Sequence, residues 1–386
     1  MPTSMTAPRA LITAANGFLG SRLIRLLVKR GERVKAFVRA GSNLESLRGL
    51  PEHQVELCIG DMQSSHTVYR ALAGCNRLYH LAANYTPWNH DPRRTLEPAL
   101  LGTQAVLEAA RHRAIRKIVI TSSATTLGST VEGVAMDEQH AFNLPSAEAT
   151  IIAKHRVERL ALEHAHRGLP LVIVNPTVIT GPGDWRPTPS GSILLRYLNW
   201  PPSRRLRMPL TGGLNIVDVD DVAAGHQLAM AKGRIGERYI LGGENLDLRD
   251  LLQGVLPEAT GLSPALSNIS RSTLMWACRW AEANARFRGR PPVATAKLVR
   301  DQLCRYIWVS SAKAERELGY THRSALEALS RGVRWYAERG YVSNESGLGG
   351  LMQGSALFAA ATSDNAASTT RRENDGGSRS AASRAA

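Results

Sequence analysis

The chain has 386 residues, a formal net charge of +15, 5% aromatic residues and four scattered cysteines. Without a CxxC pair, metal-ligand spacing or a nucleic-acid-binding motif, this composition excludes a disulfide scaffold, a metal centre and a nucleic-acid partner. Neither an apolar run of 18 residues nor an apolar signal segment is present, which excludes a transmembrane segment and predicts a cytoplasmic protein.

The first predicted unit, residues 9–39, is the most informative part of the chain. An apolar strand is followed by a turn of small residues, by a helix with leucines at helical spacing and by a second apolar strand over 34–39. This strand–turn–helix–strand order is typical of a domain that binds a dinucleotide, with the pyrophosphate at the start of the helix. The residues expected to contact the cofactor there are Thr13, Ala14, Asn16, Gly17, Phe18, Leu19 and Gly20.

The turn departs from the usual glycine pattern at one position. Gly17 and Gly20 allow the backbone to approach a pyrophosphate closely, but Ala14 stands where the first glycine is usual. If Ala14 needs a positive φ, its Cβ costs about 1 kcal/mol. The alternative is a βα turn that binds no ligand.

Arg39 ends the second strand, about 20 residues after the turn, where an acidic residue would bind the ribose 2′-hydroxyl of NAD. An arginine there suits a 2′-phosphate instead, so we expect NADP(H) as the preferred cofactor, with NAD(H) as an option. The alternative is a solvated surface arginine.

Further apolar segments predict strands at 55–60, 77–82, 117–122 and 171–175, alternating with helices at 100–113 and 153–166. This alternation predicts an α/β fold with a doubly wound parallel sheet, a Rossmann fold. We expect a dinucleotide-binding domain over 8–175, completed by about 212–242, where 215–221 form a strand, 222–231 a helix and 237–241 a further strand. Residues 176–211, expected as loops, and 243–342, expected as a mainly helical part, would bind the substrate. The composition of 343–386 predicts a disordered tail.

Several motifs carry a resemblance to a known family. They include Thr121-Ser-Ser-Ala-Thr-Thr-Leu-Gly128, Val174-Asn-Pro176 and Ser310-Ser-Ala-Lys-Ala-Glu-Arg-Glu-Leu-Gly-Tyr320. Over about residues 8–342 the chain resembles the extended short-chain dehydrogenases/reductases, of the NAD-dependent epimerase/dehydratase family. It is most similar to the hopanoid-associated sugar epimerase group and to dihydroflavonol reductases.

The resemblance implies roles for individual residues. Ser123 would hydrogen-bond the reacting oxygen of a small-molecule substrate, and Lys154 would hold the nicotinamide ribose. The remaining cofactor contacts would be Asp61 and Met62 near the adenine, Ala82 and Ala83 beneath the cofactor, and Asn175 and Pro176 beside the nicotinamide. The family also implies that a homodimer is an option.

Two departures concern proton transfer. The family places its general acid/base, a tyrosine, four residues before the lysine, and this chain has Thr150 there. A threonine hydroxyl is much less acidic than a phenol and has a shorter reach. Ala99 replaces the asparagine that holds a proton-relay water. General acid–base groups typically contribute about 10²–10⁴-fold in rate, so we expect a slow enzyme if nothing replaces the tyrosine.

Three hypotheses follow. The first is an NADP(H)-dependent oxidoreductase acting on a carbonyl or hydroxyl, with Tyr85, His155 or a substrate hydroxyl supplying the proton. The second is an NAD(P)-dependent sugar epimerase linked to hopanoid metabolism, and the third is a cofactor-binding protein with little activity. Separately, residues 272–288 place tryptophans among arginines. We expect this apolar face to pack against the cofactor domain; a peripheral contact with a membrane is the alternative.

Overall fold

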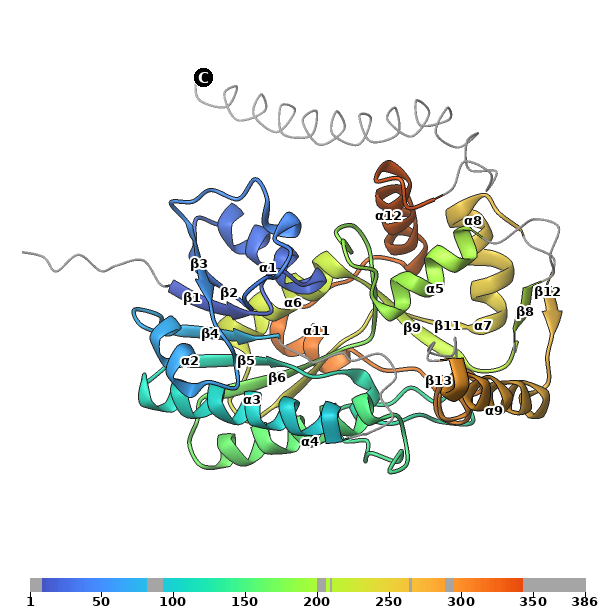
Figure 1. Cartoon of the computed structure of the whole chain (residues 1–386), viewed down its shortest axis with the longest axis horizontal. Coiled ribbons are helices and arrows are strands. Elements are labelled where there is room, and N and C mark those ends of the chain that lie inside the picture. The colour runs from blue at the N-terminus through green and yellow to red at the C-terminus, as the bar shows by residue number, and fades with distance from the viewer. Residues whose placement is uncertain are drawn as a thin grey trace, which may run out of the picture.

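A seven-stranded parallel sheet forms the centre of the protein, seen in a computed structural model that describes residues 9–81, 93–199, 206–208, 210–263, 266–288 and 295–342. Its strand order is β3-β2-β1-β4-β5-β6-β10 (Figure 1). The order reverses beside β1, and such a reversal leaves a crevice for a ligand at the carboxyl ends of the strands. The strands are β1 (Arg9–Thr13), β2 (Arg33–Val38), β3 (Val55–Ile59), β4 (Arg77–His80), β5 (Lys117–Thr121), β6 (Leu171–Pro176) and β10 (Arg238–Leu241).

Helices cover both faces of this sheet (Figure 1). Side chains alternate along β1, so Ala10 and Ile12 pack in one core and Leu11 packs in the other. The first core is covered by α1 (Phe18–Lys29), α6 (Val219–Lys232) and α11 (Ala312–Leu318). The second is covered by α2 (Ser65–Ala71), α3 (Arg93–His112) and α4 (Ala149–His166).

A smaller part of the chain forms a third hydrophobic core, with two small sheets. Strands β7 (Val178–Thr180), β9 (Gly213–Asp218), β11 (Glu244–Asp247) and β13 (Tyr306–Ile307) make the first, and β8 (Leu206–Met208) and β12 (Leu266–Asn268) the second. The helices are α5 (Pro189–Leu198), α7 (Leu248–Asp250), the π-helix η3 (Leu251–Val255), α8 (Leu256–Thr260), α9 (Arg271–Arg288), α10 (Ala296–Leu298), the π-helix η4 (Val299–Leu303) and α12 (Ala325–Glu338). Two short 3₁₀ helices, η1 (Glu45–Leu47) and η2 (Ala124–Thr126), follow β2 and β5.

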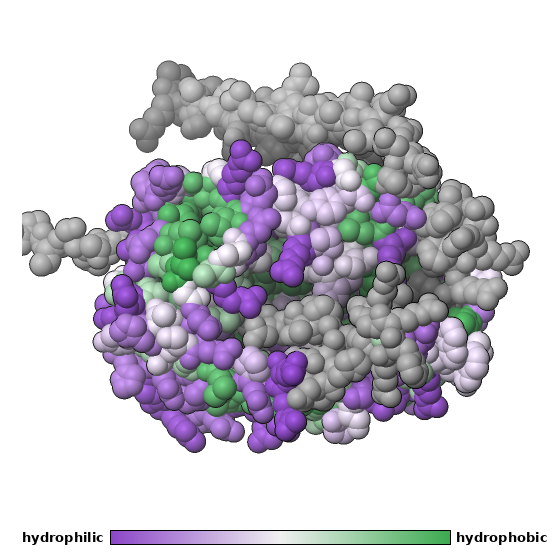
Figure 2. All heavy atoms as spheres, in the orientation of Figure 1, coloured by the Kyte–Doolittle hydropathy of each residue, from purple (hydrophilic) through white to green (hydrophobic). Residues whose placement is uncertain are grey.

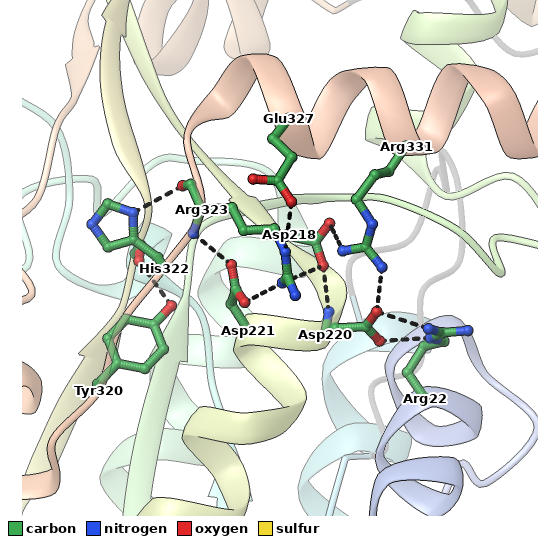
Figure 3. A network of polar contacts seen from close by, with 10 residues as sticks. Arg22, Asp218, Asp220, Asp221, Tyr320, His322, Arg323, Glu327 and Arg331 are labelled. Carbon is green, nitrogen blue, oxygen red and sulfur yellow. Dashed lines mark hydrogen bonds and ion pairs between the residues drawn. The ribbon is translucent and has the colours of Figure 1, made fainter. Parts of the chain in front are cut away.

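Ion pairs join the two parts across α1, α6 and α12 (Figure 3). Both oxygens of Asp220, in α6, accept hydrogen bonds from Arg22 of α1, at 2.7 Å each. Arg331 of α12 donates to Asp220 at 2.6 Å and to Asp218 at 2.5 Å. Because the pairs are partly shielded from water, they fix the smaller part against the first helix better than exposed pairs would.

The structure confirms the predicted fold class. The expected strands over 55–60, 77–82, 117–122 and 171–175 correspond to β3, β4, β5 and β6. The two expected helices start earlier than predicted, at Arg93 and Ala149. The residues over 343–386 lie outside the described part of the chain.

Three expectations for the second half were wrong in detail. Residues 176–211 contain β7, α5 and β8, where loops were expected. The strand expected at 215–221 is β9, which ends at Asp218 and belongs to the small sheet with β7, β11 and β13. Of this segment, only α6 and β10 complete the seven-stranded unit. Within 243–342, α11 packs on the large sheet instead of with the other helices, since Ala314 and Leu318 lie in the core under α1.

The surface of the described residues is mainly hydrophilic on the face shown in Figure 2, with a hydrophobic area over α1 and the neighbouring β2–β3 region. Among the described helices, none combines the length and the apolar composition needed to cross a membrane.

Candidate functional site

The turn between β1 and α1 packs closely against the start of the helix. Ala14 has a φ of 51°, the left-handed conformation in which a Cβ costs about 1 kcal/mol. A Cβ added at Gly20 would lie 2.3 Å from the Ala14 carbonyl oxygen, and one at Gly17 would lie 3.1 Å from it. No described side chain caps α1, and its first turn, which begins with Phe18 and Leu19, has no acidic residue. Its amide groups therefore fit a pyrophosphate.

Arg39 lies at the same edge of the sheet as this turn. Thr13 and Phe37 are neighbours in the parallel pair β1–β2, so the exposed Arg39 follows two residues beyond the end of β1. The Asn16 amide donates to the Asn43 carbonyl at 3.0 Å, which holds the segment after Arg39 beside the turn. The position suits the predicted contact with a 2′-phosphate.

Asp61 and Met62 follow β3 at the next position along this edge. One carboxylate oxygen of Asp61 accepts the Gln63 amide at 3.0 Å, but the residue is otherwise exposed. Met62 is partly buried against the second core. The predicted cofactor contacts Ala82 and Ala83, and the proton donor candidate Tyr85, lie outside the described residues.

Ser123 lies two residues after the end of β5 and is the N-cap of η2. Its hydroxyl oxygen accepts a hydrogen bond from the Thr125 hydroxyl at 2.9 Å, and Ser123 itself is partly exposed. The hydroxyl proton of Ser123 is therefore available to a substrate oxygen.

Thr150 and Lys154 lie one turn apart near the start of α4, and both are partly exposed. The Lys154 ammonium donates to the Thr121 carbonyl at 3.2 Å, which brings it to the end of β5 beside Ser123. Burial lowers the pKa of Lys154 to about 8, although the carboxylate of Glu158 acts in the opposite direction. This amine can therefore gain and lose a proton close to neutral pH.

Two buried histidines flank this lysine. His80 lies between the hydroxyls of Thr13 and Thr103, at 3.0 and 3.3 Å. His226 lies between the Thr121 hydroxyl and the Val222 carbonyl, each at 2.7 Å. Burial, and secondly the charge of Lys154, lowers the pKa of both histidines to about 4. Both imidazoles are therefore neutral near pH 7 and add no charge to the site.

Asn175, near the end of β6, supports the loop that carries Ser123 through hydrogen bonds of its side chain. Its amide nitrogen donates to Glu158 at 2.8 Å and to the Ser123 carbonyl at 3.2 Å. Arg238 pairs with the other oxygen of Glu158 at 2.9 Å. The side chain of Asn175 is fully buried in this network, and the following Pro176 is buried too. The Asn175 side chain thus supports the loop, while its predicted place beside the nicotinamide stays a prediction.

The sequence did not assign roles to His80, Thr103, Glu158 and His226. His80 is the last residue of β4, and His226 lies in α6. His226 also follows the buried Val222 by four residues, so both lie on the buried face of α6. The sequence signal for His226 is therefore a polar residue on the buried face of a helix. Its partner Thr121 on β5 could not be predicted, because the sequence does not show which strand packs against that face.

The family model described as the NAD dependent epimerase/dehydratase family matches residues 10–242. The chain belongs to this family. A putative dihydroflavonol 4-reductase from Synechocystis sp. is 34% identical over 340 residues, which cover 86% of this chain and 96% of that protein. Sterol demethylase protein B from Methylococcus capsulatus is 32% identical over 336 residues, 86% of this chain and 99% of that protein. The crystal structure of gox2253 gives a TM-score of 0.74 at 34% identity and covers 86% of this chain and 99% of that one.

These similarities confirm the predicted family and the Rossmann-type fold. The chain is a reductase-like member of an NAD-dependent family of epimerases and dehydratases. The preference for NADP(H), the role of Thr150 and the individual site residues remain predictions.

Proposed function

We propose that this protein is an NADP(H)-dependent oxidoreductase that interconverts a carbonyl and a hydroxyl group. Its main support is the arrangement of Ser123 and Lys154 at the carboxyl end of β5, which is the second strand along the sheet from β1, the strand that leads into the α1 turn. A hydroxyl donor and an ionisable amine are the two groups that a carbonyl oxygen needs when it becomes an alcohol.

The turn and Arg39 would hold the cofactor, and a bound nicotinamide would supply or accept the hydride. A Cβ at Gly20 would lie 2.3 Å from the Ala14 carbonyl oxygen, so this position requires glycine for the turn to pack on α1. The amide groups at the start of α1 would then bind the pyrophosphate. Arg39 would pair with the 2′-phosphate, and charge-assisted hydrogen bonds of this kind are stronger than neutral ones.

Lys154 takes over the acid–base role in this proposal. During reduction, Ser123 donates a hydrogen bond to the carbonyl oxygen. As the carbonyl carbon gains the hydride, the π electrons move to that oxygen, which takes a proton from the Lys154 ammonium. Its pKa of about 8 lets it give up a proton more easily than an ordinary lysine does. In the oxidation direction the neutral amine accepts the hydroxyl proton.

Among the described residues, two other candidates, Thr150 and His155, are less well suited. Thr150 has an aliphatic hydroxyl that does not ionise near neutral pH. The ring of His155 stacks on Phe142, with centroids 4.0 Å apart, and it occupies the position after Lys154, about 100° around the helix. Lys154 is therefore the ionisable group that the described geometry favours.

Single-turnover oxidation of NADPH tests this proposal. The substrate panel includes dihydroflavonols and sterols that carry a keto group, because the names of the two relatives mention dihydroflavonols and sterols. We expect slow loss of NADPH absorbance with at least one carbonyl substrate and formation of the matching alcohol. NADPH binding without oxidation across the panel would contradict an oxidoreductase.

A sugar epimerase is the second candidate, favoured by the description of the family. An epimerase reduces and reoxidises its cofactor within one cycle. It would therefore retain nucleotide through purification and interconvert sugar isomers without added cofactor. The oxidoreductase proposed above would instead exchange its cofactor and consume it stoichiometrically.

A further inference from the structure

Helix α9 (Arg271–Arg288) exposes two tryptophans on one face. The side chains of Trp276 and Trp280 are one turn apart and are 70% and 63% exposed. The opposite face is buried through Cys278 and Ala285, at 5% and 6% exposure. It packs against α10 and η4, so the expectation that the tryptophan-bearing face packs against the cofactor domain was wrong. Large aromatic side chains are seldom left in water in this way without a partner.

The charges of α9 suit an anionic partner. Its 18 residues include four arginines and one acidic residue, Glu282. A carboxylate oxygen of Glu282 accepts the Ala296 amide at 2.7 Å, so this charge is turned toward α10. Arg279 is exposed between the two tryptophans in sequence. The outward face of the described helix therefore combines aromatic rings with positive charge.

We propose that α9 lies on the surface of an anionic lipid bilayer, with Trp276 and Trp280 at the level of the headgroups. Indole rings favour the membrane–water interface, and arginines beside them pair with lipid phosphates. A second copy of this chain fits less well as the partner. A two-fold contact through this face would bring the two positively charged Arg279 side chains close together, and like charges repel. The net charge of +15 attracts the whole protein to the same kind of surface.

The bilayer-facing helix is connected to the catalytic centre through one layer of structure. Residues 295–303, on which α9 packs, reach the start of α4: Thr295 donates to Glu148, and Arg300 donates to the Ser146 carbonyl at 2.9 Å. Thr150 follows directly in the first turn of α4. A bilayer on α9 would thus be close to the side from which a membrane-dissolved substrate could enter.

Flotation of the full-length protein with vesicles tests the proposal without any need for turnover. We expect binding to mixed phosphatidylcholine–phosphatidylglycerol vesicles, weaker binding to phosphatidylcholine alone, and a loss of binding as salt is raised. The Trp276→Ala/Trp280→Ala variant should bind at least about tenfold more weakly, and Arg279→Glu about tenfold. Both sites are exposed, so the melting temperature should hardly change.

Matched controls separate a specific surface from general attraction. Ile59 on β3 is 64% exposed, and the Arg316 side chain on α11 is 68% exposed. Ile59→Ala and Arg316→Glu should leave vesicle binding within about twofold of the natural protein. Equal losses in controls and α9 variants, no binding to anionic vesicles, or a dimer that dissociates in the tryptophan variant would each overturn the proposal.

Discussion

The start of α1 and the start of α4 lie at the same edge of the sheet, but they depend on the sequence in different ways. In the proposed function, backbone amides bind the cofactor at the start of α1, where Gly20 must lack a Cβ. At the start of α4, the resemblance to the family places the general acid/base at the position of Thr150.

This difference would allow the chain to keep a cofactor-binding turn although the usual tyrosine is replaced. A pyrophosphate site tolerates Ala14 because the strain is about 1 kcal/mol and the amides are unaffected. A proton donor tolerates no such approximation, since its pKa sets the rate. In the function proposed above, Lys154 supplies the proton instead, since burial lowers its pKa to about 8.

Replacement of Lys154 is expected to have the largest effect. Lys154→Met should lower kcat by about 10²–10⁴-fold, because it removes the proposed acid and base. In the natural protein, the rate of reduction should fall as pH rises through about 8, since the ammonium is the active form, and the rate of oxidation should rise. Lys154→Arg keeps the positive charge, but a guanidinium does not lose its proton near pH 8, so this variant should lose the pH dependence. A variant with unchanged pH profiles would place the donor elsewhere.

Gly20→Ala should disturb the proposed cofactor-binding turn at the start of α1. The new Cβ would meet the Ala14 carbonyl oxygen at 2.3 Å, so α1 must shift away from β1. Overpacking of this kind costs about 1–3 kcal/mol, and we expect up to about 100-fold weaker NADPH binding by calorimetry. Gly254→Ala is the matched control, because nothing lies within 4 Å of its Cβ. Equal affinities for both variants would show that the turn does not bind the pyrophosphate.

Thr150→Tyr should restore the missing acid. With Lys154 one turn away, a phenol there would be more acidic than usual, and we expect kcat to rise about 50-fold. Thr150→Phe adds the ring without the hydroxyl and should bring no gain. If both variants lose an existing activity, Thr150 itself takes part in the reaction.

Arg39→Ala is expected to have the smallest effect and to act on binding alone. NADPH affinity should fall about tenfold, as when a charge-assisted hydrogen bond is lost, while NADH affinity stays within about twofold. Parallel titrations of the two nucleotides measure this. Equal losses for both would remove Arg39 from the 2′-phosphate site.

The sequence allowed the large sheet and the α1 turn to be predicted because both depend on local patterns. The apolar strands and the spacing of leucines fix β1, α1 and β2 within the first 39 residues. By contrast, β7 and β8 have three residues each, too few for an alternating pattern to be recognised, and they pair with strands about 35–60 residues away.

Contacts in the site were predictable only in part. Ser123 and Lys154 could be placed from motifs. His80 and His226 could not, because their hydrogen-bond partners, Thr13 on β1 and Thr121 on β5, are far away in the sequence. Which face of α9 is buried depends on where residues 295–303 fold, and its amphipathic pattern cannot specify that.

Calorimetric titration of the full-length protein with NADPH and with NADH tests the central claim most directly. The arrangement of Gly17, Gly20 and Arg39 predicts saturable binding of one nucleotide per chain, tighter for NADPH than for NADH. If neither nucleotide produces a binding heat and the two nucleotides do not compete with each other, the claim that this turn binds a nicotinamide nucleotide is contradicted.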